Sequence, residues 1–302
     1  MTELVVCSGK GGTGKTSVVA GLARLARDLV LVDADVDAAN LHLVLAPERE
    51  KTTPFHAGHV ARIRPGACRG CATCQSLCRF AAIDARETAG GETVFAVDPL
   101  RCEGCGVCVR FCPNEAVAFP SRRCGEWYVS RTSRGRLVHA ALDVGAENSG
   151  KLVSLVRAHA RRLADRLGLE LILVDGPPGI GCPASAALTG ADLTLLVTEP
   201  SLSGLHDLDR AAELAAHFDV PVAVCINKHD LSPRLTRMIE DHCRARGWPL
   251  VGRIPFDARV GEAQAAGRSI LELAPHGAAS RALTAIWHRL EHHLSSATLT
   301  KG

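Results

Sequence analysis

Residues 9–16 of the chain read Gly9-Lys10-Gly11-Gly12-Thr13-Gly14-Lys15-Thr16. An apolar run at 4–7 precedes this stretch, and a helical pattern follows it to about residue 27. Glycines allow the backbone to curl so that successive N–H groups point at phosphate oxygens, and the following helix adds its positive N-terminus. The pattern therefore predicts a phosphate-binding loop in which Lys15 reaches the β- and γ-phosphates and Thr16 binds Mg²⁺.

Outside this loop, apolar runs alternate with helical periods along most of the chain. We expect strands at 29–32, 171–174, 193–197, 220–224 and 250–252, and helices at 150–167, 183–190, 204–217, 233–246 and 277–294. Continuous Val, Leu and Ile runs are typical of strands buried on both faces of a parallel sheet. The sequence predicts an α/β fold with a doubly wound, mostly parallel sheet.

The bulk composition excludes several classes of protein. No apolar run is long enough to span a bilayer, and the first residues carry no signal-type apolar core, so we expect a cytoplasmic protein. The formal net charge of +3 is too small to indicate nucleic acid or an anionic membrane as a partner. Thirteen cysteines without an export signal favour metal or redox chemistry over disulfides.

Eight of these cysteines form two runs of the same spacing. The runs read Cys68-x2-Cys71-x2-Cys74-x3-Cys78 and Cys102-x2-Cys105-x2-Cys108-x3-Cys112-Pro113. This is the spacing of bacterial two-cluster ferredoxins, in which the fourth cysteine of each run binds the other cluster. It predicts one [4Fe–4S] cluster on Cys68, Cys71, Cys74 and Cys112, and a second on Cys78, Cys102, Cys105 and Cys108. Zinc is the competing metal, but its sites typically use two CxxC pairs.

The cysteine runs interrupt the α/β alternation. Between about residues 55 and 120 there is no long helical period, and Cys, Gly and Pro dominate. We therefore expect a discontinuous P-loop domain, residues 1–56 and 120–302, with an inserted ferredoxin-like α+β domain at 57–119.

The second lysine of the loop, Lys10, resembles the deviant P-loop of the MinD/ParA family, which includes the nitrogenase iron protein. The whole chain resembles members of this superfamily that contain an inserted two-cluster ferredoxin domain. The resemblance implies Mg²⁺-dependent ATP hydrolysis in a dimer, with Lys10 reaching across to the nucleotide of the partner. It leaves open whether the dimer is a homodimer or a heterodimer with a related ATPase.

Three further segments resemble motifs of the same family. The acidic stretch after the second strand resembles switch I, which implies that Asp35 orients water near Mg²⁺, with Asp33 and Asp37 as alternatives. Asp175, at the end of its strand, resembles the switch II aspartate that contacts Mg²⁺ through water. Asn227 and Pro255 follow later strands, where the family binds adenine.

The remaining cysteines receive different interpretations. Cys7, Cys225 and Cys243 fit small core residues, and Cys124 has no assigned role. Cys182 lies at the spacing from Asp175 at which the nitrogenase iron protein has a cluster ligand. A cluster that bridges the dimer at Cys182 is therefore one hypothesis, and a structural thiol is the other.

The leading functional hypothesis joins the two modules. ATP binding and hydrolysis drive a dimer switch that is coupled to electron transfer through the ferredoxin module, or to Fe–S or metal cofactor assembly on a partner protein. The alternative is a ParA/MinD-like ATPase of spatial organisation, in which the clusters are a redox sensor or a structural element. The sequence leaves open the partner and the cluster potentials.

Overall fold

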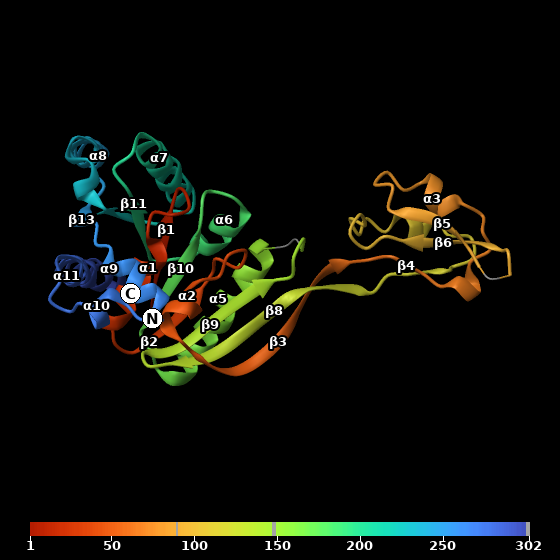
Figure 1. The fold of residues 1–302 in the computed structure, drawn as a ribbon, viewed down its shortest axis with the longest axis horizontal. Coiled ribbons are helices and arrows are strands. Elements are labelled where there is room, and N and C mark those ends of the chain that lie inside the picture. Colours follow the sequence, from red (N-terminus) through yellow and green to blue (C-terminus); the bar gives the residue numbers. More distant parts are fainter. Residues whose placement is uncertain (89, 147–148, 300–302) are drawn as a thin grey trace. The chain divides into compact units, whose positions relative to one another are not determined.

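The computed structural model describes residues 1–88, 90–146 and 149–299, which divide into two units (Figure 1). Unit 1 comprises Met1–Thr53, Glu126–Leu142 and Asn148–Gly302, and unit 2 comprises Pro54–Gly125 and Asp143–Glu147. Two long strands, β3 (Glu48–His59) and β8 (Ser121–Thr132), contribute residues to both units.

Unit 1 is built on a sheet of nine strands within the described residues, in the order β13-β12-β11-β1-β10-β2-β9-β8-β3. Neighbours from β13 to β9 pair in parallel. Besides β3 and β8 these strands are β1 (Thr2–Ser8), β2 (Leu29–Asp33), β9 (Gly135–Leu142), β10 (Leu171–Pro178), β11 (Leu193–Thr198), β12 (Val222–Asn227) and β13 (Leu250–Ile254). The predicted doubly wound, mostly parallel sheet is thus confirmed.

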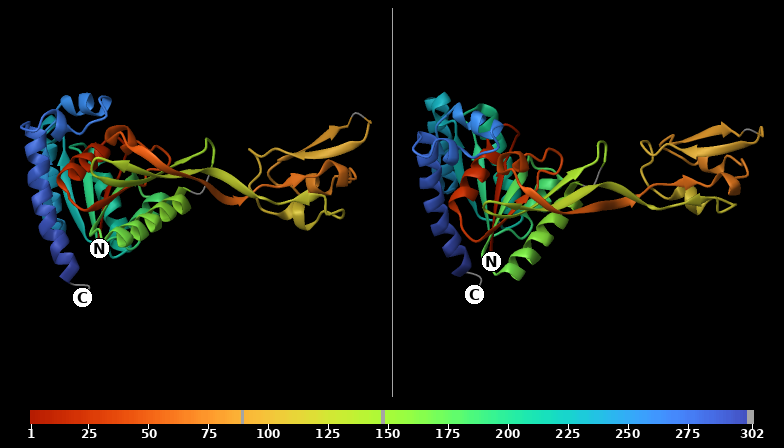
Figure 2. Two further views of the ribbon diagram at one scale, coloured as in Figure 1. Left: turned by 90° about the horizontal axis from the view of Figure 1, so that it is seen from below. Right: turned by 60° about the horizontal axis from the view of Figure 1, so that its bottom comes forward.

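Helices cover both faces of this sheet, because its central strands are apolar on both sides. All seven residues of β1 are buried. Figure 2 shows α5 and α11 on opposite sides of the strands. The helices of unit 1 are α1 (Lys15–Leu25), α2 (Leu41–Leu45), α5 (Ser149–Leu167), α6 (Cys182–Leu188), α7 (Leu202–His217), α8 (Pro233–Arg246), α9 (Arg259–Ala265), α10 (Ile270–Leu273) and α11 (Ala278–Leu299), with a short 3₁₀ turn η2 (His229–Leu231).

The strand β3 was not predicted from the sequence. Its first residues, Glu48-Arg49-Glu50-Lys51, are charged and exposed, so they show no apolar period. The strand is held at the edge by contacts across the sheet, where the Arg49 guanidinium lies 4.1 Å from the ring centre of Tyr128. The ammonium of Lys51 lies 5.7 Å from a ring centre of Trp127.

Unit 2 is small and has little core. Its elements are two short antiparallel pairs, β4 (Arg62–Ile63) with β7 (Val117–Ala118) and β5 (Ile83–Glu87) with β6 (Thr93–Val97), and the turns η1 (Pro65–Ala67), α3 (Thr73–Ser76) and α4 (Val107–Arg110). One hydrophobic cluster in it has three buried members, Cys74, Ile83 and Phe95. A unit with so small a core generally needs a metal or disulfide to be stable.

No helix in the described part of the chain is both long and apolar enough to cross a bilayer.

One buried ionic group ties α5 to the sheet of unit 1. Glu3 on β1 is 3% exposed and accepts hydrogen bonds from Arg157, at 2.6 Å, and from Arg161. We expect Glu3→Gln to lower the free energy of unfolding of unit 1 by about 3 kcal/mol, because it leaves a buried guanidinium without its carboxylate. Urea unfolding followed by tryptophan fluorescence measures this, since Trp127, Trp248 and Trp287 all belong to unit 1.

Glu240→Gln is the matched control for this substitution. It removes the half-exposed ion pair with Arg253 (2.9 Å) and should change the free energy of unfolding by less than about 1 kcal/mol. Equal effects of the two substitutions would contradict a buried ionic anchor at Glu3.

Candidate functional site

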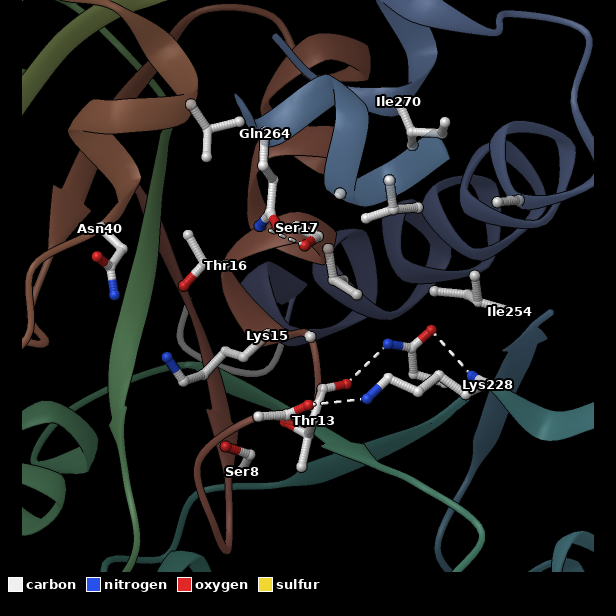
Figure 3. A pocket seen from close by; sticks show the side chains of 18 of the residues that line it. Ser8, Thr13, Lys15, Thr16, Ser17, Asn40, Lys228, Ile254, Gln264 and Ile270 are labelled. Atoms are coloured by element: carbon white, nitrogen blue, oxygen red, sulfur yellow. Dashed lines mark hydrogen bonds between the residues drawn. The ribbon is translucent and has the colours of Figure 1, made fainter. Parts of the chain in front are cut away.

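A cavity of about 730 Å³ opens in unit 1 at the carboxyl ends of its parallel strands (Figure 3). In open α/β sheets this edge is where ligands bind. The phosphate loop, switch I, and the loops after β12 and β13 all contribute to its lining, which includes Gly11, Gly12, Thr13, Gly14, Lys15, Thr16, Asp35, Asn40, Pro178, Asn227, Lys228, Pro255 and Phe256. Most residues predicted to bind the nucleotide therefore line one cavity.

The phosphate loop needs glycine for geometric reasons. Gly12 (φ 79°) and Gly14 (φ 89°) lie in the left-handed region, and Gly14 is the N-cap of α1. A Cβ on Gly14 would lie 2.3 Å from Nδ2 of Asn227, whereas one on Gly12 would meet nothing within 4 Å. The loop and the end of β12 are therefore packed directly on each other at Gly14.

Lys15 carries a buried charge that acidic side chains compensate. It is 6% exposed, and its Nζ donates to Oδ1 of Asp175 at 3.0 Å and lies 3.8 Å from Oδ2 of Asp35. Burial alone would lower the pKa of Lys15, but the charge and hydrogen bond of Asp175, with Asp35, raise it. The second oxygen of Asp175, Oδ2, is buried without a hydrogen-bond partner among the described residues, as suits an acceptor for a metal-bound water.

The three aspartates of switch I have different environments. Asp33 is fully buried, and its oxygens accept hydrogen bonds from the backbone N–H groups of Asp35 (3.1 Å) and Leu41 (3.0 Å), so it shapes the loop. Asp35 lines the cavity, and burial raises its pKa despite the nearby Lys15. Asp37 is exposed. Of the three, Asp35 is the carboxylate that lines the cavity.

Lys10 and Gly9 do not line the cavity. The Nζ of Lys10 lies 2.8 Å from Oε1 of Glu199 and donates to the hydroxyls of Ser203 (2.9 Å) and Ser201 (3.3 Å). Lys10 is thus held by residues at the start of α7 and just before it. Glu199 and the two serines were not predicted, because only the fold brings residues about 190 positions away next to the loop.

Asn227 serves the phosphate loop in this structure. Its Nδ2 donates to the carbonyl of Thr13 at 2.7 Å, and its Oδ1 accepts from the N–H of Lys228. The next side chain, Lys228, donates from Nζ to the carbonyl of Gly12 at 2.9 Å. Figure 3 shows Lys228 beside the loop, near Thr13.

In unit 2 the eight cysteines of the two runs line two separate cavities. The first is lined by Cys68, Cys71, Cys74 and Cys112, and the second by Cys78, Cys102, Cys105 and Cys108. Across the described residues, no three His, Cys, Asp or Glu side chains are arranged to hold a single metal ion. Each cavity also has apolar lining, including Phe95 in the first and Phe119 in the second.

The backbone repeats the same unusual conformations in both cysteine runs. Left-handed residues occur at matching positions, with Gly70, Ala72 and Ala81 in the first run and Gly104, Gly106 and Glu115 in the second. The fourth cysteines also match, since Sγ of Cys78 accepts from the N–H of Ala82 (3.4 Å) and Sγ of Cys112 from that of Ala116 (3.3 Å). Strained conformations at residues other than glycine are typical of functional loops.

The thiols nearest the core of unit 2 have raised pKa values. Burial raises the pKa of Cys74, and the neighbouring Cys68, Cys112 and Cys71 raise it further. Burial, followed by the charges of neighbouring cysteines, raises the pKa of Cys108 to about 11. Several thiolates crowded in one place repel one another, so the arrangement favours a bound cation.

The other five cysteines lie apart from these cavities. Cys7, Cys225 and Cys243 are buried in unit 1, as expected for core residues. Cys124 is buried in unit 2, where its Sγ donates to the carbonyl of Ala57 at 3.3 Å. Cys182 is exposed at the first position of α6.

Comparisons with known proteins agree with the geometry of unit 1. The family described as CbiA: CobQ/CobB/MinD/ParA nucleotide binding domain matches residues 4–270. The uncharacterized protein MJ0578 of Methanocaldococcus jannaschii is 32% identical over 233 residues, which is 76% of this chain and 79% of that protein. The carbon monoxide dehydrogenase accessory protein CooC of Rhodospirillum rubrum is 26% identical over 279 residues, 90% of each chain.

A solved structure shows the same fold. The septum site-determining protein MinD of Pyrococcus horikoshii, complexed with Mg-ADP, has a TM-score of 0.58 and 19% sequence identity, and the match covers 96% of each chain.

The close packing at Gly14 gives a test of the nucleotide site. We expect Gly14→Ala to weaken Mg-ADP binding at least about tenfold more than Gly12→Ala, because both strain the backbone but only the first collides with Asn227. Isothermal titration calorimetry of both variants measures the difference. Equal losses in the two variants would contradict the role given to the contact with Asn227.

Proposed function

Because this chain belongs to the CobQ/CobB/MinD/ParA family of nucleotide-binding domains, we propose that it is a Mg²⁺-dependent ATPase with two [4Fe–4S] clusters in unit 2. The nucleotide state of unit 1 controls electron transfer through the clusters, or Fe–S or metal cofactor assembly on a partner protein. The protein acts as a homodimer, or as a heterodimer with a related ATPase.

The charges around Lys15 support nucleotide binding. Lys15 is neutralised by Asp175 and Asp35. A phosphate bound in the cavity would attract this ammonium, and an accompanying Mg²⁺ would compensate the two carboxylates. Thr16, Asp35 and Asp175 are the residues proposed to hold the Mg²⁺, the last of them through water.

Hydrolysis needs a positioned water and compensation of the charge that develops on the phosphates. Asp35 is proposed for the first task, because it lines the cavity and its Oδ2 lies 3.8 Å from Nζ of Lys15. Lys15 supplies positive charge from its own chain, and Lys10 is proposed to supply it to the partner's nucleotide. Asn227 and Pro255 are proposed to flank the adenine, with the exposed Phe256 beside them.

The observation that carries the cluster proposal is the division of the eight cysteines between two cavities. Each cavity holds three cysteines of one run and the fourth cysteine of the other, which is the ligand set of a two-cluster ferredoxin. The N–H···S hydrogen bonds to Cys78 and Cys112 are of the kind that tune cluster potentials. When bound, such clusters supply one-electron transfer.

A single-ion site such as zinc fits unit 2 less well. Zinc draws four sulfurs onto one atom, but no three candidate ligands in the described residues are gathered in that way. In a [4Fe–4S] cluster each cysteine binds a different iron, so the sulfurs stand further apart. The small core of unit 2 adds to this, because two clusters would hold together loops that little else stabilises.

A redox or metallocofactor protein is the partner that these features suggest. CooC, which is similar to this chain over 90% of its length, is an accessory protein of a dehydrogenase, that is, of an enzyme that transfers electrons. If the partner is such an enzyme, both units contribute: unit 1 changes conformation with its nucleotide, and unit 2 carries the clusters.

Iron analysis tests the cluster proposal. Protein purified without oxygen should contain about eight iron atoms per chain, the content of two [4Fe–4S] clusters. Because the fourth ligands are exchanged between the runs, Cys112→Ser should disturb the cluster of Cys68, Cys71 and Cys74. Loss of this one cluster should lower the iron content toward about four. Iron quantitation with EPR of the reduced protein measures both effects.

Cys124→Ser provides the control, since Cys124 is buried, lines neither cysteine cavity, and its Sγ donates to the carbonyls of Ala57 and Arg122. Its iron content should equal that of the unsubstituted protein. A chain that binds two zinc ions and no iron would overturn the proposed function of unit 2.

A further inference from the structure

We propose that Lys228 and Glu199 are positioning residues of the nucleotide site, which hold the phosphate loop in its binding shape through the carbonyl of Gly12. This inference rests on the proposed nucleotide binding and adds two residues to it. Neither residue belongs to the phosphate-loop motif.

The need for such residues follows from the loop itself. A phosphate loop turns its N–H groups inward to the ligand, so some of its carbonyls point outward and require donors. Here the carbonyls of Gly12 and Thr13 receive donors from two consecutive side chains, Lys228 (2.9 Å) and Asn227 (2.7 Å). Both residues stand at the carboxyl end of β12, so one strand end holds the loop at two successive carbonyls.

The backbone at Lys228 is strained in a way that serves this contact. Lys228 has φ 54° and ψ 36°, a left-handed conformation that costs a residue with a Cβ about 1 kcal/mol. In a regular strand the side chains of two successive residues point to opposite faces. The left-handed turn at Lys228 allows both Asn227 and Lys228 to donate to carbonyls of the phosphate loop. Strain at a residue other than glycine persists only where its surroundings require it.

Glu199 fixes the ammonium group of Lys228. Its Oε2 lies 3.1 Å from Nζ of Lys228, and its Oε1 lies 2.8 Å from Nζ of Lys10. Burial alone would raise the pKa of Glu199, but the hydrogen bonds from Lys10 and Lys228 lower it, so the carboxylate is charged at neutral pH.

The loop that carries Glu199 is bonded to and packed against the start of α7. The carbonyl of Glu199 accepts from the N–H of Ser201 at 2.7 Å, and a Cβ on Gly204 would lie 2.4 Å from that carbonyl. The side chain of Ser201 caps α7 by accepting from the N–H of Gly204. The backbone of Glu199 is therefore held beside α7, and Nζ of Lys228 lies between the carboxylate of Glu199 and the carbonyl of Gly12.

Lys228 acts on the loop and not on the chemical step. Lys15 and Asp35 contact each other at the cavity, while Lys228 contacts a backbone carbonyl of the loop. Loss of Lys228 should weaken nucleotide binding and leave the turnover of bound ATP nearly unchanged. A catalytic role would give the opposite pattern.

The test uses Lys228→Met, which keeps the length of the side chain and removes the donor. We expect its Kd for Mg-ADP to rise about tenfold, the effect of one lost hydrogen bond to a charged group, with kcat changed less than about threefold. Hydrogen exchange at the amides of Gly12, Thr13 and Gly14 in the nucleotide-free protein should become faster. Lys228→Arg should restore binding to within about threefold, and Glu199→Gln should give an intermediate Kd.

Arg253→Met is the matched control, because it removes a half-exposed cation from an ion pair elsewhere in unit 1. It should change neither the Kd nor the exchange of the loop. A rise in Kd without faster exchange, or faster exchange without a rise in Kd, overturns the positioning role of Lys228. If the unsubstituted protein binds no nucleotide, the proposed function fails, and the exchange measurement alone then decides whether Lys228 holds the loop.

Discussion

The buried ammonium of Lys15 beside the carboxylate of Asp175 is the interaction on which unit 1 depends. Lys15 begins α1 and Asp175 lies in β10, and the parallel register of β1 with β10 pairs Val6 with Asp175. An isolated charge at this depth would cost several kcal/mol, so the two residues require each other. In the proposed function, a phosphate would compensate the charge of Lys15 and a Mg²⁺ that of Asp175. The fold of the sheet and the proposed chemistry therefore depend on the same two residues.

Around this pair, polar side chains form hydrogen bonds with backbone N–H and carbonyl groups as well as with other side chains. Asp33 fixes switch I through two backbone N–H groups, and Asn227 with Lys228 fixes the phosphate loop through two carbonyls. Unit 2 relies on the same device in another form, since its two cysteine runs repeat their left-handed turns and N–H···S bonds. If the proposed nucleotide and clusters bind, a backbone already held in this way lowers the cost of ordering on binding.

The parallel strands and the cavity could be predicted from the sequence because local patterns specify them. Runs such as Leu29–Asp33 are apolar throughout, and glycines mark the phosphate loop. The edge strand β3 could not be predicted, since its first residues are charged and exposed, and it is defined by pairing with β8 and by contacts of Arg49 and Lys51 with rings on that strand. The short helices α9 and α10 were not predicted either, because each depends on contacts with another helix: α9 with α2, and α10 with α1.

Among the switch I aspartates the sequence already favoured Asp35, and the structure adds how their environments differ. Burial and backbone hydrogen bonds distinguish the loop-forming Asp33 from Asp35, which lines the cavity. Glu199 and Lys10 are a second case, because they are neighbours in space and far apart along the chain. Patterns in the sequence identify residues that act on a ligand better than residues that act on one another.

Coupling between the two modules is the central claim, and one measurement tests it most directly. The intact protein, purified without oxygen, is titrated redox-potentiometrically by EPR with Mg-ADP, with a non-hydrolysable Mg-ATP analogue, and without nucleotide. If the nucleotide state controls the clusters, the analogue shifts their midpoint potentials or line shapes relative to Mg-ADP, and Lys15→Ala abolishes the shift. Identical titrations in all three states, with nucleotide binding verified in the same samples, would contradict the coupling.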